Sequence, residues 1–145
     1  MRSSLFLAGL LCGFLLAIGL TSKAQLSLSI FGLSKHSTPN TFCEYNPGWG
    51  LSYGLNEDWR LTAVKYKNSL CRESDAYGAV YTPFKLGRFE LGTAILRITG
   101  YSDSAMYVPI PVISYRGNGY AIDAIVVAKP TGGVIGVGLR VPLRW

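Results

Sequence analysis

The last twelve residues of the chain, Val-Ile-Gly-Val-Gly-Leu-Arg-Val-Pro-Leu-Arg-Trp (134–145), decide its fold. Bulky side chains occupy the odd-numbered positions from Ile135 to Trp145, whereas smaller or charged residues occupy most of the even-numbered ones. Because successive side chains of a strand point to opposite faces, one face of this segment suits lipid and the other does not. The pattern predicts a strand of a transmembrane β-barrel. A strand of a soluble β-sandwich is the alternative interpretation.

Seven further segments with the same two-residue period precede this strand. Most are close to the roughly 9–11 residues that a tilted transmembrane strand requires. The expected strands are Leu26–Lys35, Gly48–Asn56, Trp59–Lys67, Ala76–Lys85, Phe89–Gly100, Val108–Tyr115, Gly119–Ala128 and Val134–Trp145. Short turns rich in Gly, Asn and Asp alternate with mostly longer loops, which is typical of bacterial outer-membrane barrels with the long loops outside the cell. We therefore predict an all-β fold, an eight-stranded antiparallel transmembrane β-barrel.

Residues 1–24 are expected to form a cleaved signal peptide. Arg2 precedes an uncharged apolar run, and Ser22-Lys23-Ala24 provides small residues three before and one before a cleavage point. The apolar run is shorter than the ~20 residues of a membrane-spanning helix, which disfavours that alternative. Residues 25–145 would then form a single barrel domain in the cell outer membrane.

The exported part is mildly basic. Without Arg2 and Lys23, twelve basic and eight acidic residues remain, and they do not cluster. This excess suits a surface that carries anionic lipid phosphates, and it argues against nucleic-acid binding. A single histidine without clustered carboxylates is not a metal-ligand set, and no phosphate-binding glycine loop is present. We expect no metal and no cofactor.

Sorting the alternating residues by face and height divides the expected lumen into two halves. Near the short turns, charges of both signs should form a paired network, because buried charges are tolerated only in pairs. Its expected members are Arg60, Glu90, Asp123, Arg140 and Arg144. The upper half should enclose an apolar space for a hydrocarbon chain, lined by Gly48, Gly50, Gly54, Leu96, Ile98 and Gly136. The alternative is that the glycines relieve strand curvature.

Candidate chemistry lies in the long loops. His36 follows the first strand, and Asn68-Ser69 begin the second long loop on the same side of the barrel. A histidine at this position could act as general base to a serine hydroxyl, or could deprotonate an acceptor hydroxyl directly. Cys43 and Cys71 lie in the same two loops, and passage through an oxidising compartment favours a disulfide between them over two free thiols.

Four short motifs mark the chain between residues 34 and 112. They are Ser34-Lys35-His36, Tyr45-Asn46-Pro47-Gly48-Trp49-Gly50, Tyr66-Lys67-Asn68-Ser69 and Tyr107-Val108-Pro109-Ile110-Pro111-Val112. In order and approximate spacing, and together with the aromatic C-terminus, they resemble the lipid A palmitoyltransferases of the outer membrane. The resemblance implies an acyl pocket in the outer half of the barrel. It also implies transfer of a palmitoyl-like chain from a phospholipid to lipid A or lipopolysaccharide.

The resemblance also implies roles for particular residues. The family's catalytic histidine and serine correspond to His36 and Ser69, and the glycine that floors its acyl pocket corresponds to Gly78. Prolines that mark gaps in backbone pairing, where lipid passes sideways, correspond to Pro109 and Pro111. We include Pro47 in this expected lateral gate.

Two departures from the family pattern are visible. Asn68 stands where the family has an acidic residue, so we expect Asn68 to orient His36 or to donate a hydrogen bond to an oxyanion. Glu73 or Asp75 could supply the missing carboxylate. The family's amphipathic helix before the first strand is expected to be absent, because only about eleven exported residues precede His36.

Two other functions stay open. The chain could be a non-catalytic outer-membrane barrel with a structural, adhesive or exclusion role, whose loops bind an outside partner. It could also be a lipid A deacylase, although His36-Ser37 matches that pattern poorly. In each case we expect a monomer.

Overall fold

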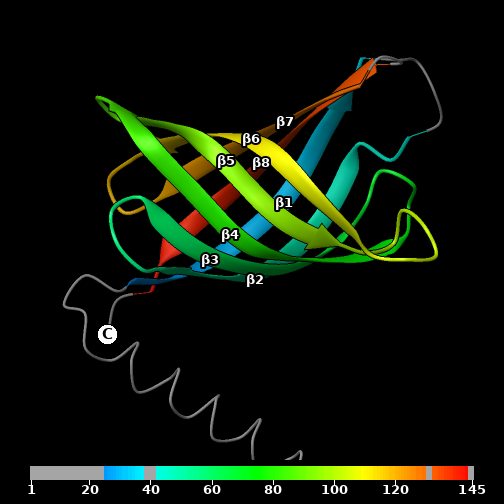
Figure 1. Cartoon of the computed structure of the whole chain (residues 1–145), viewed down its shortest axis with the longest axis horizontal. Helices are drawn as coiled ribbons and strands as arrows, with labels where there is room; N and C mark the ends of the chain where they lie inside the picture. The colour runs from blue at the N-terminus through cyan, green and yellow to red at the C-terminus, as the bar shows by residue number, and fades with distance from the viewer. Residues whose placement is uncertain (1–24, 38–41, 130–131, 144–145) are drawn as a thin grey trace, which may run out of the picture.

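The structure, a computed structural model, describes residues 25–37, 42–129 and 132–143. Within them, strands that follow one another along the chain close into an antiparallel barrel (Figure 1). The strands are β1 Gln25–His36, β2 Tyr45–Gly54, β3 Trp59–Lys67, β4 Glu73–Leu86, β5 Phe89–Ile98, β6 Met106–Arg116, β7 Ala121–Lys129 and β8 Gly132–Pro142. The predicted eight-stranded antiparallel barrel is confirmed.

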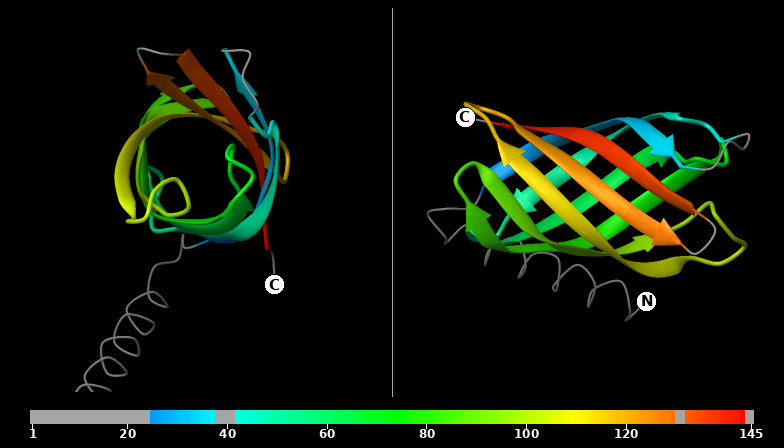
Figure 2. Two further views of the ribbon diagram at one scale, coloured as in Figure 1. Left: turned by 90° about the vertical axis from the view of Figure 1, so that its right-hand side faces the viewer. Right: turned by 90° about the horizontal axis from the view of Figure 1, so that it is seen from above.

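The barrel has two rims. The upper rim carries the β1–β2, β3–β4, β5–β6 and β7–β8 connections and lies to the right in Figure 1. The lower rim carries the other three connections and the ends of the described chain, where the Leu143 N–H donates to the Leu26 carbonyl over 2.8 Å. Figure 2, in its left view, looks along the barrel from the upper rim.

The strands extend further than the sequence predicted at several upper ends. β2 begins at Tyr45 and β4 at Glu73, three residues earlier than expected in each case, and β7 and β8 approach within two residues of each other. The β7–β8 connection is therefore shorter than the expected strand ends, Ala128 and Val134, implied. Asn46 and Pro47 are typical turn residues, yet they lie within β2. The strand accommodates them at an irregularity in its pairing with β1, where the register shifts between Phe31 and Leu33.

The outer and inner faces alternate as the pattern predicted. On β2, Trp49 and Leu51 are exposed, whereas Gly50 and Ser52 are buried. The exposed large apolar side chains continue around the wall; they include Ile30, Phe84, Leu91, Ile95, Tyr107, Ile113, Ile122 and Leu139. A continuous apolar outer face is what lipid requires of a membrane barrel. The described residues contain no helix long and apolar enough to cross a membrane.

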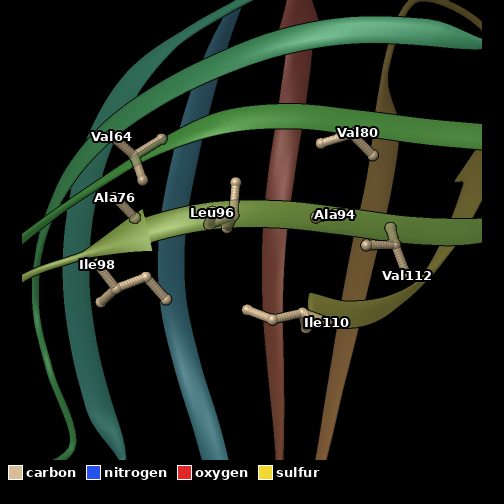
Figure 3. Packing of buried hydrophobic residues seen from close by; sticks show 8 residues of the cluster. All are labelled: Val64, Ala76, Val80, Ala94, Leu96, Ile98, Ile110 and Val112. Carbon is tan, nitrogen blue, oxygen red and sulfur yellow. The ribbon is translucent and has the colours of Figure 1, made fainter. Parts of the chain in front are cut away.

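The apolar core fills one side of the lumen. Eight buried side chains from β3 to β6 pack together (Figure 3): Val64, Ala76, Val80, Ala94, Leu96, Ile98, Ile110 and Val112. Phe31, Ile125 and Val127, from β1 and β7, pack against them. On the side formed by β1 to β3 the lumen is polar, with hydrogen bonds between the hydroxyls of Ser29 and Ser52 (2.8 Å) and of Ser52 and Thr62 (2.9 Å).

Lumen glycines permit close approach of neighbouring strands. A Cβ at Gly50 would lie 2.1 Å from the Ala63 carbonyl oxygen, and one at Gly78 would lie 2.0 Å from the Ile95 carbonyl oxygen. Real side chains do not tolerate such contacts with backbone, so these strands require glycine to bend and pack at these points. The structure favours the curvature interpretation of these glycines over the interpretation that they leave open space.

Candidate functional site at the upper rim

His36 is the last residue of β1 and faces the lumen. It pairs with Val134 of β8. Two residues earlier, on the same face of β1, Ser34 pairs with Gly136, which lies beside the Ile125 side chain that packs on the apolar core. The imidazole stacks on Phe42 with ring centroids 4.4 Å apart, and its Nδ1 is buried without a hydrogen-bond partner among the described residues. Stacking on Phe42 holds the ring in place.

Asn68 is fully buried and organises the turn that begins with it. Its Oδ1 accepts from the N–H groups of Leu70 (2.9 Å) and Arg72 (3.1 Å). Its Nδ2 donates to Ser74 Oγ (2.9 Å) and to the Gly100 carbonyl (3.0 Å). Both amide hydrogens are therefore used within the two rim loops. In this geometry no amide hydrogen of Asn68 is left for an oxyanion, and its expected role toward His36 stays a prediction.

Gly100 makes this arrangement sterically feasible. Its φ is +84°, and a Cβ there would lie 2.4 Å from both the Glu73 carbonyl oxygen and Ser74 Oγ. Only glycine adopts this conformation while allowing such contact. The following Tyr101 packs against the apolar core, so the β5–β6 loop turns inward over the barrel mouth.

A disulfide joins the first two rim loops. Cys43 and Cys71 are bridged with their Cα atoms 5.5 Å apart, as predicted. The backbone N–H of Cys43 also donates to the Ser69 carbonyl over 2.9 Å. Ser69 is half-buried in the turn that Asn68 organises. His36 and Ser69 thus lie on rim segments that are tied together covalently and by backbone bonding.

Asn46 braces the same region from below and explains part of the Tyr45-Asn46-Pro47 motif. Its buried amide donates to the carbonyls of Cys43 (3.1 Å) and Lys67 (3.0 Å), and its Oδ1 accepts from Ser34 Oγ. One side chain therefore connects β1, β2 and β3 directly below the candidate site. This role could not be predicted from the sequence, because the burial of Asn46 depends on the register between β1 and β2.

Glu44 is a carboxylate in contact with the His36 backbone, and nothing in the sequence pattern pointed to it. Its Oε1 accepts from the His36 backbone N–H over 3.5 Å, and its Oε2 pairs with Lys35 Nζ at 2.9 Å. The Lys35 hydrogen bond holds the pKa of Glu44 below its ordinary value, with a further contribution from His36. The predicted substitutes, Glu73 and Asp75, lie at the start of β4, where they pair with Lys67 and Lys65 of β3. Their predicted role beside His36 stays a prediction.

Backbone pairing between β6 and β7 stops halfway up the barrel. It runs from Arg116↔Ala121 to Val112↔Ile125 and does not include Pro109 or Pro111. Pairing of β6 with β5 continues past both prolines, so the break is confined to the β7 side. In the left view of Figure 2, β7 and β8 separate from β6 at the upper rim. Pro47 lies in the register shift between β1 and β2, a smaller irregularity.

The residues expected to line an acyl pocket fall into three groups. Leu96 and Ile98 are buried in the apolar core, as lumen residues. Gly48, Gly50, Gly78 and Gly136 also face inward, but the space beside them is occupied by neighbours, such as Ile125 Cγ1 at 3.0 Å from a Cβ at Gly136. Gly54 is misplaced in the prediction, because it pairs with Arg60 at the opposite end of the barrel.

The charge network of the lower lumen divides into two clusters. Asp123 pairs with Arg60 Nη2 (3.3 Å) and Arg140 Nε (3.1 Å), and it accepts from the Ser114 hydroxyl. Buried Glu90 pairs with two residues that the prediction did not include, Lys85 (3.2 Å) and Arg116 (2.6 Å). Arg144, the other expected member, lies outside the described residues, as do the expected signal peptide and the terminal Trp145.

A polar cavity of about 270 Å³ lies beside this network. Gly54, Asn56, Arg60, Glu90, Arg116 and Arg140 are among its lining residues. Most of this lining is polar or charged, so the cavity suits water rather than a hydrocarbon chain. The residues the structure describes contain no group of three His, Cys, Asp or Glu side chains that could hold a metal ion.

These features define a class: a small transmembrane β-barrel with an apolar wall, a charge-paired lower lumen and a disulfide-tied upper rim. A solved structure similar to this chain is the solution NMR structure of the de novo designed TMB2.3, a likeness with a TM-score of 0.58 at 12% identity. It covers 86% of this chain and 100% of that one, and it shows the fold alone. No family model and no curated protein matches the chain.

Proposed function

We propose that the protein is an outer-membrane acyltransferase that moves a palmitoyl-like chain from a phospholipid to lipid A, with its upper rim outside the cell. The observation that carries the proposal is the upper rim itself. A lumen-facing imidazole and a half-buried serine lie on segments tied by the Cys43–Cys71 bridge and by the bond from Cys43 to Ser69. The resemblance to lipid A palmitoyltransferases assigns catalytic roles to the same two residues.

The chemistry requires one base and one hydroxyl. Nε2 of His36 takes the proton of the attacking hydroxyl, either that of Ser69 or that of the lipid A acceptor. The oxygen attacks the ester carbonyl of the phospholipid, the bond from that carbonyl to the glycerol oxygen breaks, and the proton passes to the departing lysophospholipid. If Ser69 attacks first, a second round transfers the chain from Ser69 to the lipid A hydroxyl. Water in place of that acceptor would release free fatty acid.

The break between β6 and β7 supports a lateral path for the donor lipid. Unpaired backbone facing lipid is costly, because the bilayer offers no hydrogen-bond partner. A break at Pro109 and Pro111 reduces that cost, since proline has no N–H to leave unsatisfied. A lipid chain passing between β6 and β7 would reach the apolar core around Leu96 and Ile98.

One observation favours the second candidate, a non-catalytic barrel. The glycines expected to leave space instead meet neighbouring strands, and Ile125 lies over Gly136. An acyl chain could then bind in the upper lumen only if side chains such as Phe31, Ile125 and Val127 move aside. A deacylase is not favoured by any contact at the rim.

The two candidates predict different outcomes in one assay. Purified protein in detergent is incubated with phosphatidylcholine that carries a labelled acyl chain, together with lipid A. Labelled lipid A that disappears in His36→Ala and Ser69→Ala, but persists in the exposed rim control Ser104→Ala, supports acyl transfer. Labelled free fatty acid without labelled lipid A identifies a lipase. Unchanged substrate with folded, disulfide-bonded protein overturns the proposal in favour of a non-catalytic barrel.

A further inference from the structure

The site lacks a carboxylate where the resemblance expects one. In a Ser-His-Asp arrangement, the acidic residue holds the imidazole and stabilises the imidazolium that forms during proton transfer. Asn68 is neutral, and its hydrogen-bonding groups are all engaged within the rim loops. His36 Nδ1 is buried and lacks a partner among the described residues. Something else must compensate the positive charge if His36 acts as a base.

Glu44 is fixed beside His36 by three contacts. The Ser34 N–H donates to the Glu44 backbone carbonyl over 2.8 Å, which pairs the end of β1 with the residue before β2. Its side chain then reaches the His36 backbone N–H with one carboxylate oxygen and Lys35 with the other. The carboxylate is therefore held against the His36 backbone by contacts with three consecutive residues of β1.

The charges around His36 favour this assignment. Among the described residues, Lys35 and Glu44 form an ion pair at the end of β1, and Glu44 also contacts the His36 backbone. The β8 residues across from this end, Val134, Ile135 and Gly136, are uncharged, so β8 offers no competing charge. Glu44 is exposed, and water and salt screen its field, so its effect on the imidazolium should be moderate and should weaken at high ionic strength.

We propose that Glu44 is the positioning carboxylate of this site, which supports His36 by its charge and by holding the His36 backbone rather than by a bond to Nδ1. Lys35 in turn holds the Glu44 carboxylate and moderates its charge. The catalytic meaning of this assignment rests on the proposed function. The electrostatic pairing itself can be measured without any activity.

The contact between Glu44 and His36 can be tested directly at the His36 backbone amide, which donates to the Glu44 carboxylate. Amide NMR spectra are recorded in detergent micelles for the wild type, Glu44→Gln, Lys35→Gln and the control Glu73→Gln. We expect the His36 amide signal to move in Glu44→Gln, to move less in Lys35→Gln, and to stay in place in Glu73→Gln. An unmoved His36 amide signal in Glu44→Gln overturns the proposal.

Kinetics separate this proposal from the proposed function. In the acyl-transfer assay, Glu44→Gln should lower kcat/KM by about three- to tenfold, as expected for loss of one partly screened charge. Glu44→Asp, which keeps the negative charge, should restore part of the lost kcat/KM. If the wild type transfers no acyl chain, the proposed function fails and the NMR result alone decides the pairing. If the wild type is active and Glu44→Gln matches it in rate and pH profile, Glu44 has no such role.

Discussion

The backbone N–H of Cys43 donates to the carbonyl oxygen of Ser69 over 2.9 Å, beside the bridge from Cys43 to Cys71. The segment around Cys43, just before β2, and the turn holding Ser69 are therefore tied together. Loops on a protein surface are usually more mobile than the strands they connect. The disulfide and this hydrogen bond therefore restrict how far Ser69 can move relative to the end of β1.

Removing the bridge should loosen the rim and lower stability. Cys43→Ser with Cys71→Ser opens a link across a sequence separation of 28 residues, for which chain entropy predicts a loss of about 3–4 kcal/mol. We expect a lower thermal unfolding midpoint in detergent and weaker acyl transfer, with an intact barrel. Oxidised wild type treated with reductant should behave like the double variant. Identical unfolding of all three samples would contradict this expectation.

Placing at position 68 the acidic residue found in lipid A palmitoyltransferases should harm this protein. Asn68→Asp replaces the Nδ2 donor to Ser74 and Gly100 with an oxygen, which would face the Gly100 carbonyl without a hydrogen. A buried acceptor left unsatisfied costs about 1–3 kcal/mol, and more if it is charged. We expect reduced stability and no gain in acyl transfer. Higher activity in Asn68→Asp would show that Asn68 can reach the reacting groups after all.

Restoring backbone hydrogen-bond donors where β6 and β7 are unpaired should weaken access of the donor phospholipid to the lumen. Pro109→Ala with Pro111→Ala restores two N–H donors next to the unpaired part of β7. We expect at least about a threefold rise in KM for the phospholipid donor if additional strand pairing narrows its path, a factor that requires under 1 kcal/mol. Pro83→Ala, on β4 at an irregular point of its pairing with β5, is the matched control. Equal donor kinetics in the two variants would remove this break from the mechanism.

Breaking the Asp123 cluster should strongly destabilise the barrel. Asp123→Asn leaves Arg60 and Arg140 without a carboxylate partner. Both arginine side chains are largely buried, so water cannot readily replace that partner. Removing one partner of a buried ion pair costs about 3–5 kcal/mol. Urea unfolding in lipid vesicles should report this loss, whereas Asp103→Asn on the exposed β5–β6 loop should match the wild type. A small effect from Asp123→Asn would mean that water in the adjacent cavity solvates the arginines.

The Lys35–Glu44 pair should give the rim a modest dependence on acidic pH. Its pairing lowers the pKa of Glu44 from an ordinary value of 4.5, so the charged form is favoured in the folded state. The contribution is present above pH 4.5 and is lost as pH falls through the lowered folded-state pKa. Unfolding midpoints of the wild type and Glu44→Gln should differ near neutral pH and converge on acidification. A constant difference across this range would exclude the pair as its source.

The alternation of single residues determined most of the barrel from the sequence alone. Trp49 and Leu51 against Gly50 and Ser52 specified which face meets lipid, because a strand repeats every two residues and the two environments differ sharply. The cysteines in separate loops similarly predicted their bridge. Charges of both signs at lumen positions predicted pairing, although the sequence could not say that Glu90 pairs with Lys85 and Arg116 rather than with arginines of the Asp123 cluster.

Tertiary structure alone decided what the upper rim contains. The sequence indicated His36 and Ser69, but the burial of Asn68 and the contact of Glu44 with His36 depend on the β1–β2 register shift and on the approach of Gly100. The roles of the lumen glycines were likewise undetermined, since a missing side chain leaves either open space or room for a neighbouring strand. Periodicity along one strand specifies its faces; which atoms meet across the barrel is specified by register and closure, and these come from contacts between strands far apart in the chain.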